Sequence, residues 1–198
     1  NDGHLDIFVG NFAHGAAYQN RSQFLRNLGP KGKYKFEDKT AGSGLGYQES
    51  YASPALGDFD NDGDLDLYFT TVYGHNHSVL YSNEGGWKFK NITAPQGLGS
   101  LPPTYQSAWG DIDNDGDADL YVTNVRTGNK LFLNDGRAKF TDISNGSGLA
   151  HKGHSSSAVF FDYDRDGLLD LFLCNVGQYT HDSLRDVQGD QTDSGREE

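Results

Sequence analysis

The chain has 198 residues, a formal net charge of −12 and 35% hydrophobic residues, a length that suits one domain or part of a larger one. Its acidity argues against nucleic acid as a partner, because a phosphate backbone requires a basic surface. The chain also lacks an apolar stretch near the roughly 18 residues that a spanning helix needs, so we expect no membrane span.

The acidic residues are concentrated in a motif that recurs four times along the chain. It opens the sequence as NDGHLDIFVG and returns as GDFDNDGDLDLYFT, GDIDNDGDADLYVT and FDYDRDGLLDLFLC. The aspartate before each DG glycine recurs in steps of 60, 53 and 51 residues, at Asp2, Asp62, Asp115 and Asp166. We therefore expect repeats near residues 1–50, 51–103, 104–153 and 154–176, followed by a polar tail or insertion at 177–198.

Each repeat predicts short β-strands in the same order. In the second repeat SPALG precedes the acidic motif, LDLYFTTV ends it, and SVLYSNEG and WKFKNIT follow. The turns NEGG and NDGR are typical of tight hairpins between the third and fourth strands. Counted in this way, the first repeat offers three strands, the second and third offer four each, and the fourth offers two.

Four antiparallel strands in about 50 residues are typical of a β-propeller blade. The predicted fold is therefore all-β, a β-propeller fragment of about three and a half four-stranded blades over residues 1–176. Because a propeller closes its ring with at least four blades, we expect the remaining blades from the parent chain or a partner. The absence of methionine, and a start inside the motif, likewise suggest a piece of a longer protein.

The acidic loop joins the first strand of a repeat to the second and has the pattern D-x-D-x-D-G-x-x-D. Carboxylates at positions one, three and five of a tight loop converge on one point, and position nine closes the cage. Oxygen ligands in this number fit Ca²⁺ better than Mg²⁺. The expected ligands are Asp58, Asp60, Asp62, Asp64, Asp66, Asp111, Asp113, Asp115, Asp117, Asp119, Asp162, Asp164, Asp166, Leu168 and Asp170 in three complete sites, and Asp2, His4 and Asp6 in a fourth, partial site.

The other loop positions refine this prediction. Position seven includes Leu168, which has no side-chain oxygen, so its ligand there is expected to be the backbone carbonyl. Position four holds Arg165 in the last loop, where Asn61 and Asn114 stand in the others, and we expect this non-ligand difference to matter little. Positions two and eight are expected to point into the sheet; they hold Phe59, Leu65, Ile112, Ala118, Tyr163 and Leu169.

Two other loop types can be set aside, and one alternative stays open. An EF-hand needs a glutamate at position twelve, where this chain has Phe69, Val122 and Leu173. Tandem nonapeptide calcium repeats fail because these loops stand about 50 residues apart. Solvated acidic turns without a metal remain the alternative interpretation.

The only cysteine, Cys174, can form no intrachain disulfide. It lies in the apolar run LDLFLCNV, which has the pattern of a buried strand. We therefore expect Cys174 to be a buried small hydrophobe rather than a reactive thiol.

The acidic motif followed by LDLY or LDLF resembles the FG-GAP/VCBS repeat of integrin α-subunit propellers. The segments LFLNDGRAKFTDISNGSGLA and WGDIDNDGDADLYVTN are more specifically similar to the secreted ASPIC/UnbV family, which includes cartilage acidic proteins and exported bacterial proteins. The resemblance covers about residues 1 to 176. It implies a Ca²⁺-stabilised propeller that is secreted and extracellular, or periplasmic or on the cell surface if bacterial, with a binding, adhesive or scaffolding role.

The strand ends opposite the acidic loops carry polar and aromatic residues that are candidates for ligand binding. We expect this face to recognise protein or carbohydrate without catalysis, because the chain has no nucleophile elbow or phosphate loop. The alternative is that the chain is the propeller part of a polysaccharide lyase or dehydratase-type enzyme. Turnover of an acidic polysaccharide that is lost in His154→Ala would support this alternative. The candidate ligand-binding residues are His75, His77, Tyr105, Gln106, His151 and His154.

Overall fold

The computed structural model describes residues 3–10, 22–45, 53–72, 77–94, 96–98, 101–124 and 127–176. The tail predicted at 177–198 lies outside the described residues, as do Asp2 and His75. Within the described part, no helix is long and apolar enough to cross a membrane.

The described residues form thirteen β-strands, in the order and number that the repeats predict. A 3₁₀ turn, η1 (Pro30–Gly32), lies between the second and third of these strands. The strands are β1 (Ile7–Val9), β2 (Gln23–Asn27), β3 (Phe36–Asp38), β4 (Ser53–Gly57), β5 (Asp66–Thr70), β6 (Val79–Asn83), β7 (Phe89–Asn91), β8 (Thr104–Gly110), β9 (Asp119–Asn124), β10 (Lys130–Asn134), β11 (Phe140–Asp142), β12 (Ser155–Phe161) and β13 (Asp170–Asn175).

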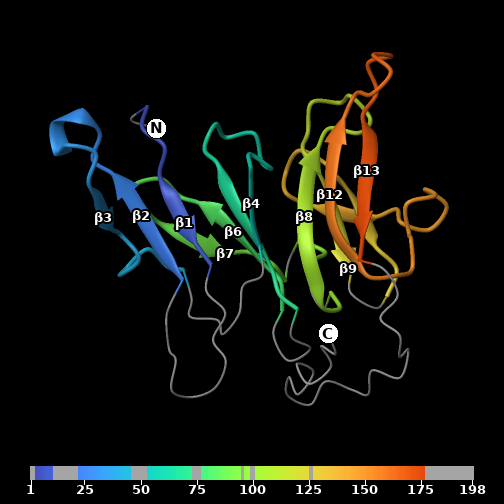
Figure 1. Cartoon of the computed structure of the whole chain (residues 1–198), viewed down its shortest axis with the longest axis horizontal. Helices are drawn as coiled ribbons and strands as arrows, with labels where there is room; N and C mark the ends of the chain where they lie inside the picture. The colour runs from blue at the N-terminus through green and yellow to red at the C-terminus, as the bar shows by residue number, and fades with distance from the viewer. Residues whose placement is uncertain are drawn as a thin grey trace, which may run out of the picture.

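These strands pair into four antiparallel sheets, each built from strands that follow one another in sequence. The orders are β1-β2-β3, β4-β5-β6-β7, β8-β9-β10-β11 and β12-β13. The all-β prediction and its count of three, four, four and two strands are therefore confirmed. The sheets follow one another across the molecule, and in the last three sheets the acidic loops, which join β4 to β5, β8 to β9 and β12 to β13, lie at the upper end of the view in Figure 1.

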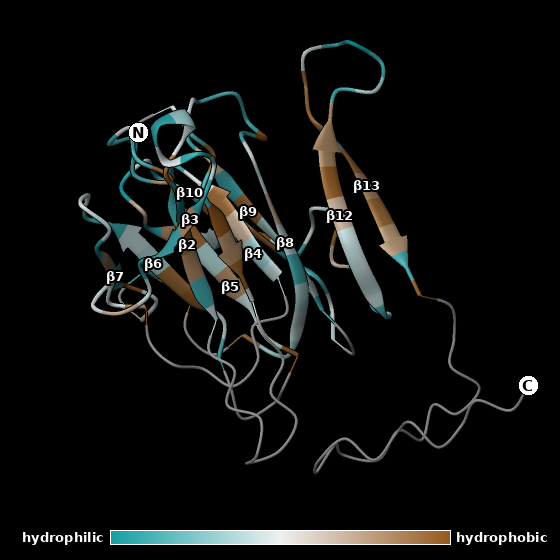
Figure 2. Cartoon of the chain, turned by 60° about the vertical axis from the view of Figure 1, so that its left-hand side comes forward, coloured by the Kyte–Doolittle hydropathy of each residue, from teal (hydrophilic) through white to brown (hydrophobic). Residues whose placement is uncertain are grey.

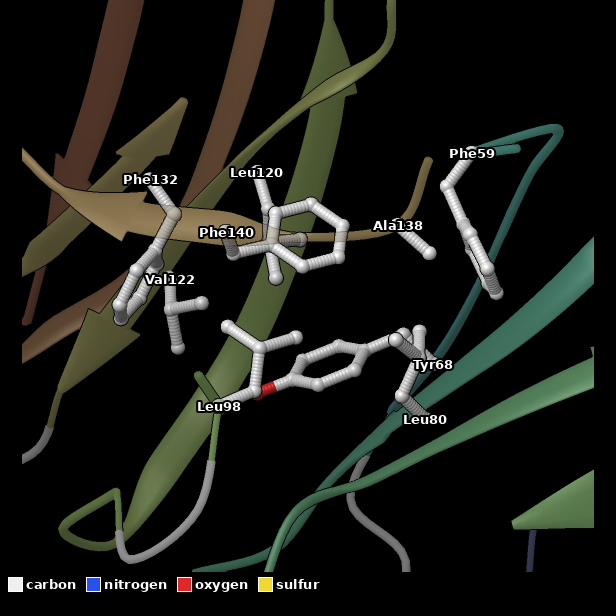
Figure 3. Close-up of a cluster of buried hydrophobic side chains, with 9 residues drawn as sticks. All are labelled: Phe59, Tyr68, Leu80, Leu98, Leu120, Val122, Phe132, Ala138 and Phe140. Carbon is white, nitrogen blue, oxygen red and sulfur yellow. The ribbon is translucent and has the colours of Figure 1, made fainter. Parts of the chain in front are cut away.

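The hydrophobic core is divided into three layers, one between each pair of successive sheets. The largest layer joins the second and third sheets, and Figure 3 shows side chains of both sheets facing one another there. In this layer Tyr68 of β5 and Leu120 of β9 are fully buried. Because both faces of β5 and β9 are covered, every residue of these two strands is buried.

A glycine at the end of the first strand lets the next sheet approach closely. A Cβ atom added to Gly57 would lie 2.9 Å from the ring of Trp109, and one on Gly110 would lie 2.8 Å from Phe160. The aromatic ring of each following first strand therefore fits over the glycine of the preceding one. In the last sheet the equivalent position, directly before the acidic loop, holds Phe161 instead.

The outer face of β12 and β13 is apolar and uncovered by other described residues. Phe172 is 57% exposed, although Tyr68 and Tyr121, which hold the same place in the two preceding sheets, are fully buried. Figure 2 shows hydrophobic colour along most of β13 and on the half of β12 nearer the acidic loop. Cys174 is also exposed, so its predicted burial is wrong. The reason is that a strand of this pattern is buried only where another sheet packs on it.

Candidate metal-binding loops

The three complete acidic loops share one backbone conformation, held by the aspartate at position one. Asp58 accepts hydrogen bonds from the backbone N–H groups of Asp62, at 3.2 Å, and Gly63, at 3.0 Å. Asp111 and Asp162 form the equivalent pairs of bonds in their own loops. Position four is left-handed in each loop, and the glycine at position six has a φ of 88° to 93°. Residues other than glycine rarely adopt a φ as positive as that of position six.

Each loop gathers three carboxylates around one point. Potential ligand oxygens lie within 4.8 Å of one another in three groups: Asp58, Asp60 and Asp62; Asp111, Asp113 and Asp115; and Asp162, Asp164 and Asp170. In the loops at 58–66 and 111–119 these are positions one, three and five, as predicted, whereas the group in the loop at 162–170 contains position nine. This last group, which contains position nine, belongs to the sheet β12-β13. The described residues contain no further sheet beyond that one.

The charge arrangement at the second repeat fits a divalent cation. Oδ1 of Asp60 is buried and has no hydrogen-bond partner in the structure. Burial, and then the charges of Asp62 and Asp58, raise the pKa of Asp60 above its ordinary value. A hard dication with oxygen ligands would satisfy this atom and neutralise the mutual repulsion. The residues present are therefore suited to Ca²⁺.

The aspartate at position nine is held mainly by backbone N–H groups. Asp66 accepts one hydrogen bond from Phe59, within its own loop, and another at 2.7 Å from Asn83, at the end of β6. Asp119 is bound in the same way by Ile112 and Asn134. Both carboxylates are buried, so each ties the acidic loop to the third strand of its sheet.

The asparagine that ends each third strand was not predicted as part of the site. Besides its backbone bond to Asp66, Asn83 donates from Nδ2 to the carbonyl of Leu65 at 3.0 Å. The same pair of bonds joins Asn27 to Asp6 and Leu5, and Asn134 to Asp119 and Ala118. The available signal was the sequence N-x-G, which occurs at this place in the first three repeats.

Position seven turns its side chain toward the hairpin that follows the third strand. A Cβ atom on Gly136 would lie 2.5 Å from Oδ2 of Asp117 and one on Gly85 would lie 3.8 Å from Oδ2 of Asp64, so both carboxylates lie against hairpin glycines. His4 lies against Gly29 in the same way. Neither Asp64 nor Asp117 belongs to a carboxylate group described above. This placement agrees with a carbonyl ligand at position seven, which stays a prediction.

Two of the residues expected to point into a sheet are exposed instead. Phe59 at position two is fully buried, but Tyr163 at the same position is 77% exposed because no further sheet covers it. Leu65 at position eight is 55% exposed. The expectation that these residues point into a sheet therefore holds for Phe59 and is wrong for Leu65 and Tyr163.

Of the candidate ligand-binding residues that the structure describes, Tyr105 and Gln106 lie in the first half of β8, and His151 and His154 lie just before β12, two strands whose other ends carry acidic loops. His77 lies just before β6. Tyr105 is 42% exposed in β8, and His77 and His151 are exposed. Gln106 serves the fold, because its Oε1 accepts a hydrogen bond from the backbone of Ala158 in the next sheet at 2.8 Å. Among the described residues no histidine belongs to a group of three potential metal ligands.

The metal-free chain should lose stability as the pH rises from about 4 to about 7. Burial first, and then the charges of Asp60 and Asp62, raise the pKa of Asp66 to about 7, although two backbone N–H groups lower it. Because this pKa lies above the ordinary value of 3.8, the stabilisation from the bound proton is complete below that value and lost as the pH passes 7.

Thermal melts between pH 4 and pH 8, in EDTA and in CaCl₂, would measure this effect. Ca²⁺ replaces the proton, so the stabilisation by calcium should grow over the same interval. Asp66→Asn should reduce the pH dependence of the chelated protein. A chelated protein whose melting temperature rises from pH 4 to pH 7 would contradict the assignment.

Comparison with known proteins agrees with the repeats and loops. A family model described as FG-GAP-like repeat matches residues 1–69, 58–122 and 111–173, each match running from one acidic loop through the next. The chain therefore belongs to the FG-GAP-like repeat family, and the resemblance seen in the motifs is confirmed.

Among curated proteins, the chain is similar to cartilage acidic protein 1. It is 27% identical over 172 residues to the protein of Homo sapiens, which covers 81% of this chain and 26% of that protein. It is 26% identical over 171 residues to the Mus musculus protein, with the same shares covered, and 28% identical over 155 residues to that of Xenopus tropicalis, covering 72% and 24%. The chain thus spans about a quarter of the length of these relatives.

Proposed function

We propose that this chain is a segment of a secreted, calcium-stabilised β-propeller that serves as a non-catalytic binding or structural module. The observation that supports it best is the repetition of one loop conformation with three converging carboxylates in each complete loop. In this proposal Ca²⁺ supplies the positive charge that holds each loop closed between the first two strands of a blade.

The propeller arrangement is supported by the packing of the sheets. Four sheets of sequential antiparallel strands follow one another, with a hydrophobic layer between each pair. The exposed Phe172 occupies a place that the next sheet buries in the two preceding repeats. A further blade, from the parent chain or a partner, would cover it and continue the ring.

A binding role is supported by the family and by the division of the sheets into two ends. The relatives carry the name cartilage acidic protein, which states no reaction. The acidic loops take up one end of the sheets, which leaves the end with Tyr105, His151 and His154 for a protein or carbohydrate partner. Side chains that bind calcium cannot at the same time serve as a general acid and base, which disfavours the enzyme alternative.

The calcium assignment can be tested with two variants of one loop. Asp113→Ala should abolish one calcium ion per chain, because Asp113 belongs to the group of converging carboxylates. Asp117→Ala should keep the full number of ions, because its carboxylate lies against Gly136 and position seven offers its carbonyl. Equilibrium dialysis with ⁴⁵Ca²⁺ would count the ions, and the loss of an ion from both variants would contradict the ligand assignment.

A further inference from the structure

The second and third acidic loops are joined by a hydrogen bond between their side chains. Asn61, at position four of the second loop, donates from Nδ2 to Oδ1 of Asp117 in the third loop at 2.6 Å. Its left-handed backbone, with a φ of 58°, turns this side chain out of its own loop. Position four, which the sequence suggests is idle, therefore connects two neighbouring sites.

A second connection runs behind the same two loops through Asn134. Its Nδ2 donates to the carbonyl of Phe59 at 2.7 Å, while its backbone N–H donates to Asp119 at 2.9 Å. The N–H of Phe59 in turn donates to Asp66. The carboxylates at position nine of the two loops are thus linked through the backbone of Phe59 and through Asn134.

The third and fourth acidic loops have a weaker form of the same link. Asn114 donates from Nδ2 to the backbone carbonyl of Gly167 at 3.0 Å. The position-seven residue there is Leu168, so no carboxylate is available as the acceptor. Hydrogen bonds to charged groups are about twice as strong as neutral ones. The link between the second and third loops should therefore contribute a larger coupling free energy than the link between the third and fourth.

We propose that the loops at 58–66 and 111–119 bind Ca²⁺ cooperatively, and that Asn61 and Asn134 carry the coupling between them. This inference rests on the proposed calcium binding. An ion at 58–66 fixes the left-handed turn at Asn61 and the backbone of Phe59 on both sides of its Cα. These two groups then hold Asp117 and Asn134 in the positions that the second ion requires. The second ion is bound by a loop that is already ordered, so less conformational entropy is lost.

The proposal can be tested by following each loop separately in a calcium titration. The amides of Gly63, Gly116 and Gly167 each donate to the position-one aspartate of their own loop, so their NMR signals report its occupancy. The titrant is CaCl₂ added to chelator-treated protein. In the unaltered chain the Gly63 and Gly116 signals should change over the same narrow calcium range, with a Hill coefficient above one.

Asn61→Gly is the informative variant, because glycine keeps the left-handed turn and removes only the side chain. It should weaken the calcium affinity of the 111–119 loop about tenfold, within the range of typical coupling between sites, and bring the Hill coefficient toward one. Arg165→Gly is the matched control, at the same loop position with a φ of 65°, and should leave the Gly63 and Gly116 midpoints unchanged.

The possible outcomes separate the coupling from the calcium binding itself. If Asn61→Gly shifts the Gly116 midpoint no more than Arg165→Gly does, the coupling is refuted while the calcium sites stand. The same holds if Gly63 and Gly116 of the unaltered chain titrate independently. If the three glycine signals do not respond to CaCl₂ at all, the proposed function fails, and the coupling fails with it. A tenfold shift confined to Asn61→Gly supports the inference.

Discussion

Chelation with excess EDTA is expected to lower the melting temperature of this protein by on the order of 20 °C, and added Ca²⁺ to restore it. A ligand at 100 times its dissociation constant stabilises the folded state by about 2.7 kcal/mol per site, or about 8 kcal/mol for three sites. A domain of this size is commonly stable by about 5 to 15 kcal/mol and shifts by about 2 to 4 °C per kcal/mol. Calcium is therefore expected to account for much of the stability.

Differential scanning calorimetry with and without EDTA would measure the shift, and Mg²⁺ provides the control. Mg²⁺ requires a near-ideal octahedron and keeps its water, so the same concentration should restore much less of the melting temperature. A melting curve that EDTA leaves unchanged would show that these loops are solvated acidic turns, the alternative that the sequence leaves open.

Asp119→Ala is expected to destabilise the chain by about 2 to 6 kcal/mol even in the absence of metal. Removing this buried carboxylate leaves the N–H groups of Ile112 and Asn134 without their partner. Each buried donor left unsatisfied costs about 1 to 3 kcal/mol. The chain should also lose calcium, but the structural part of the effect is separable because it persists in EDTA.

Urea unfolding in EDTA would give this loss, with Asp170→Ala as the matched control. Asp170 occupies the same loop position in the last sheet, but it is exposed, and within the described part of the chain its carboxylate accepts one hydrogen bond, from Tyr163, at 2.9 Å. The control should therefore lose less than about 1 kcal/mol, since water can satisfy the freed N–H. Equal losses in the two variants would mean that burial at position nine contributes nothing.

The arrangement of the strands could be predicted because the repeats supply several copies of one pattern. The aspartates mark the register, and the strand and turn signals between them recur at nearly the same step. Three loop carboxylates at alternate positions then predict a converging group by geometry alone. The pattern of any single strand is weak evidence for its position, but the four repeats place their strands in the same order, and this agreement made the prediction possible.

The contacts that hold each loop from outside could not be predicted in the same way. The sequence N-x-G has an ordinary explanation as hairpin chemistry, which conceals the bond from Asn83 to Asp66. The link from Asn61 to Asp117 joins residues 56 positions apart and depends on how two sheets sit against each other. Periodicity shows which residues share a face, but it gives no distance between faces.

The prediction of burial from the strand pattern failed for a related reason. The apolar patterns around Phe172 and Cys174 match those of buried strands, yet both residues are exposed. The pattern of a strand indicates which of its faces is apolar. Whether that face is buried depends on whether a neighbouring sheet packs against it.

Phe161 has a consequence for the order of the repeats. Gly57 and Gly110 each form a hollow that accepts the ring of the following sheet, whereas Phe161 at the same place fills that hollow with a ring of its own. At this place the fourth unit differs from the second and third units. The fourth could not stand before either of them, because Trp109 or its counterpart would meet Phe161. The units are alike in fold but not interchangeable, and their succession is specified by the shape of their contact surfaces.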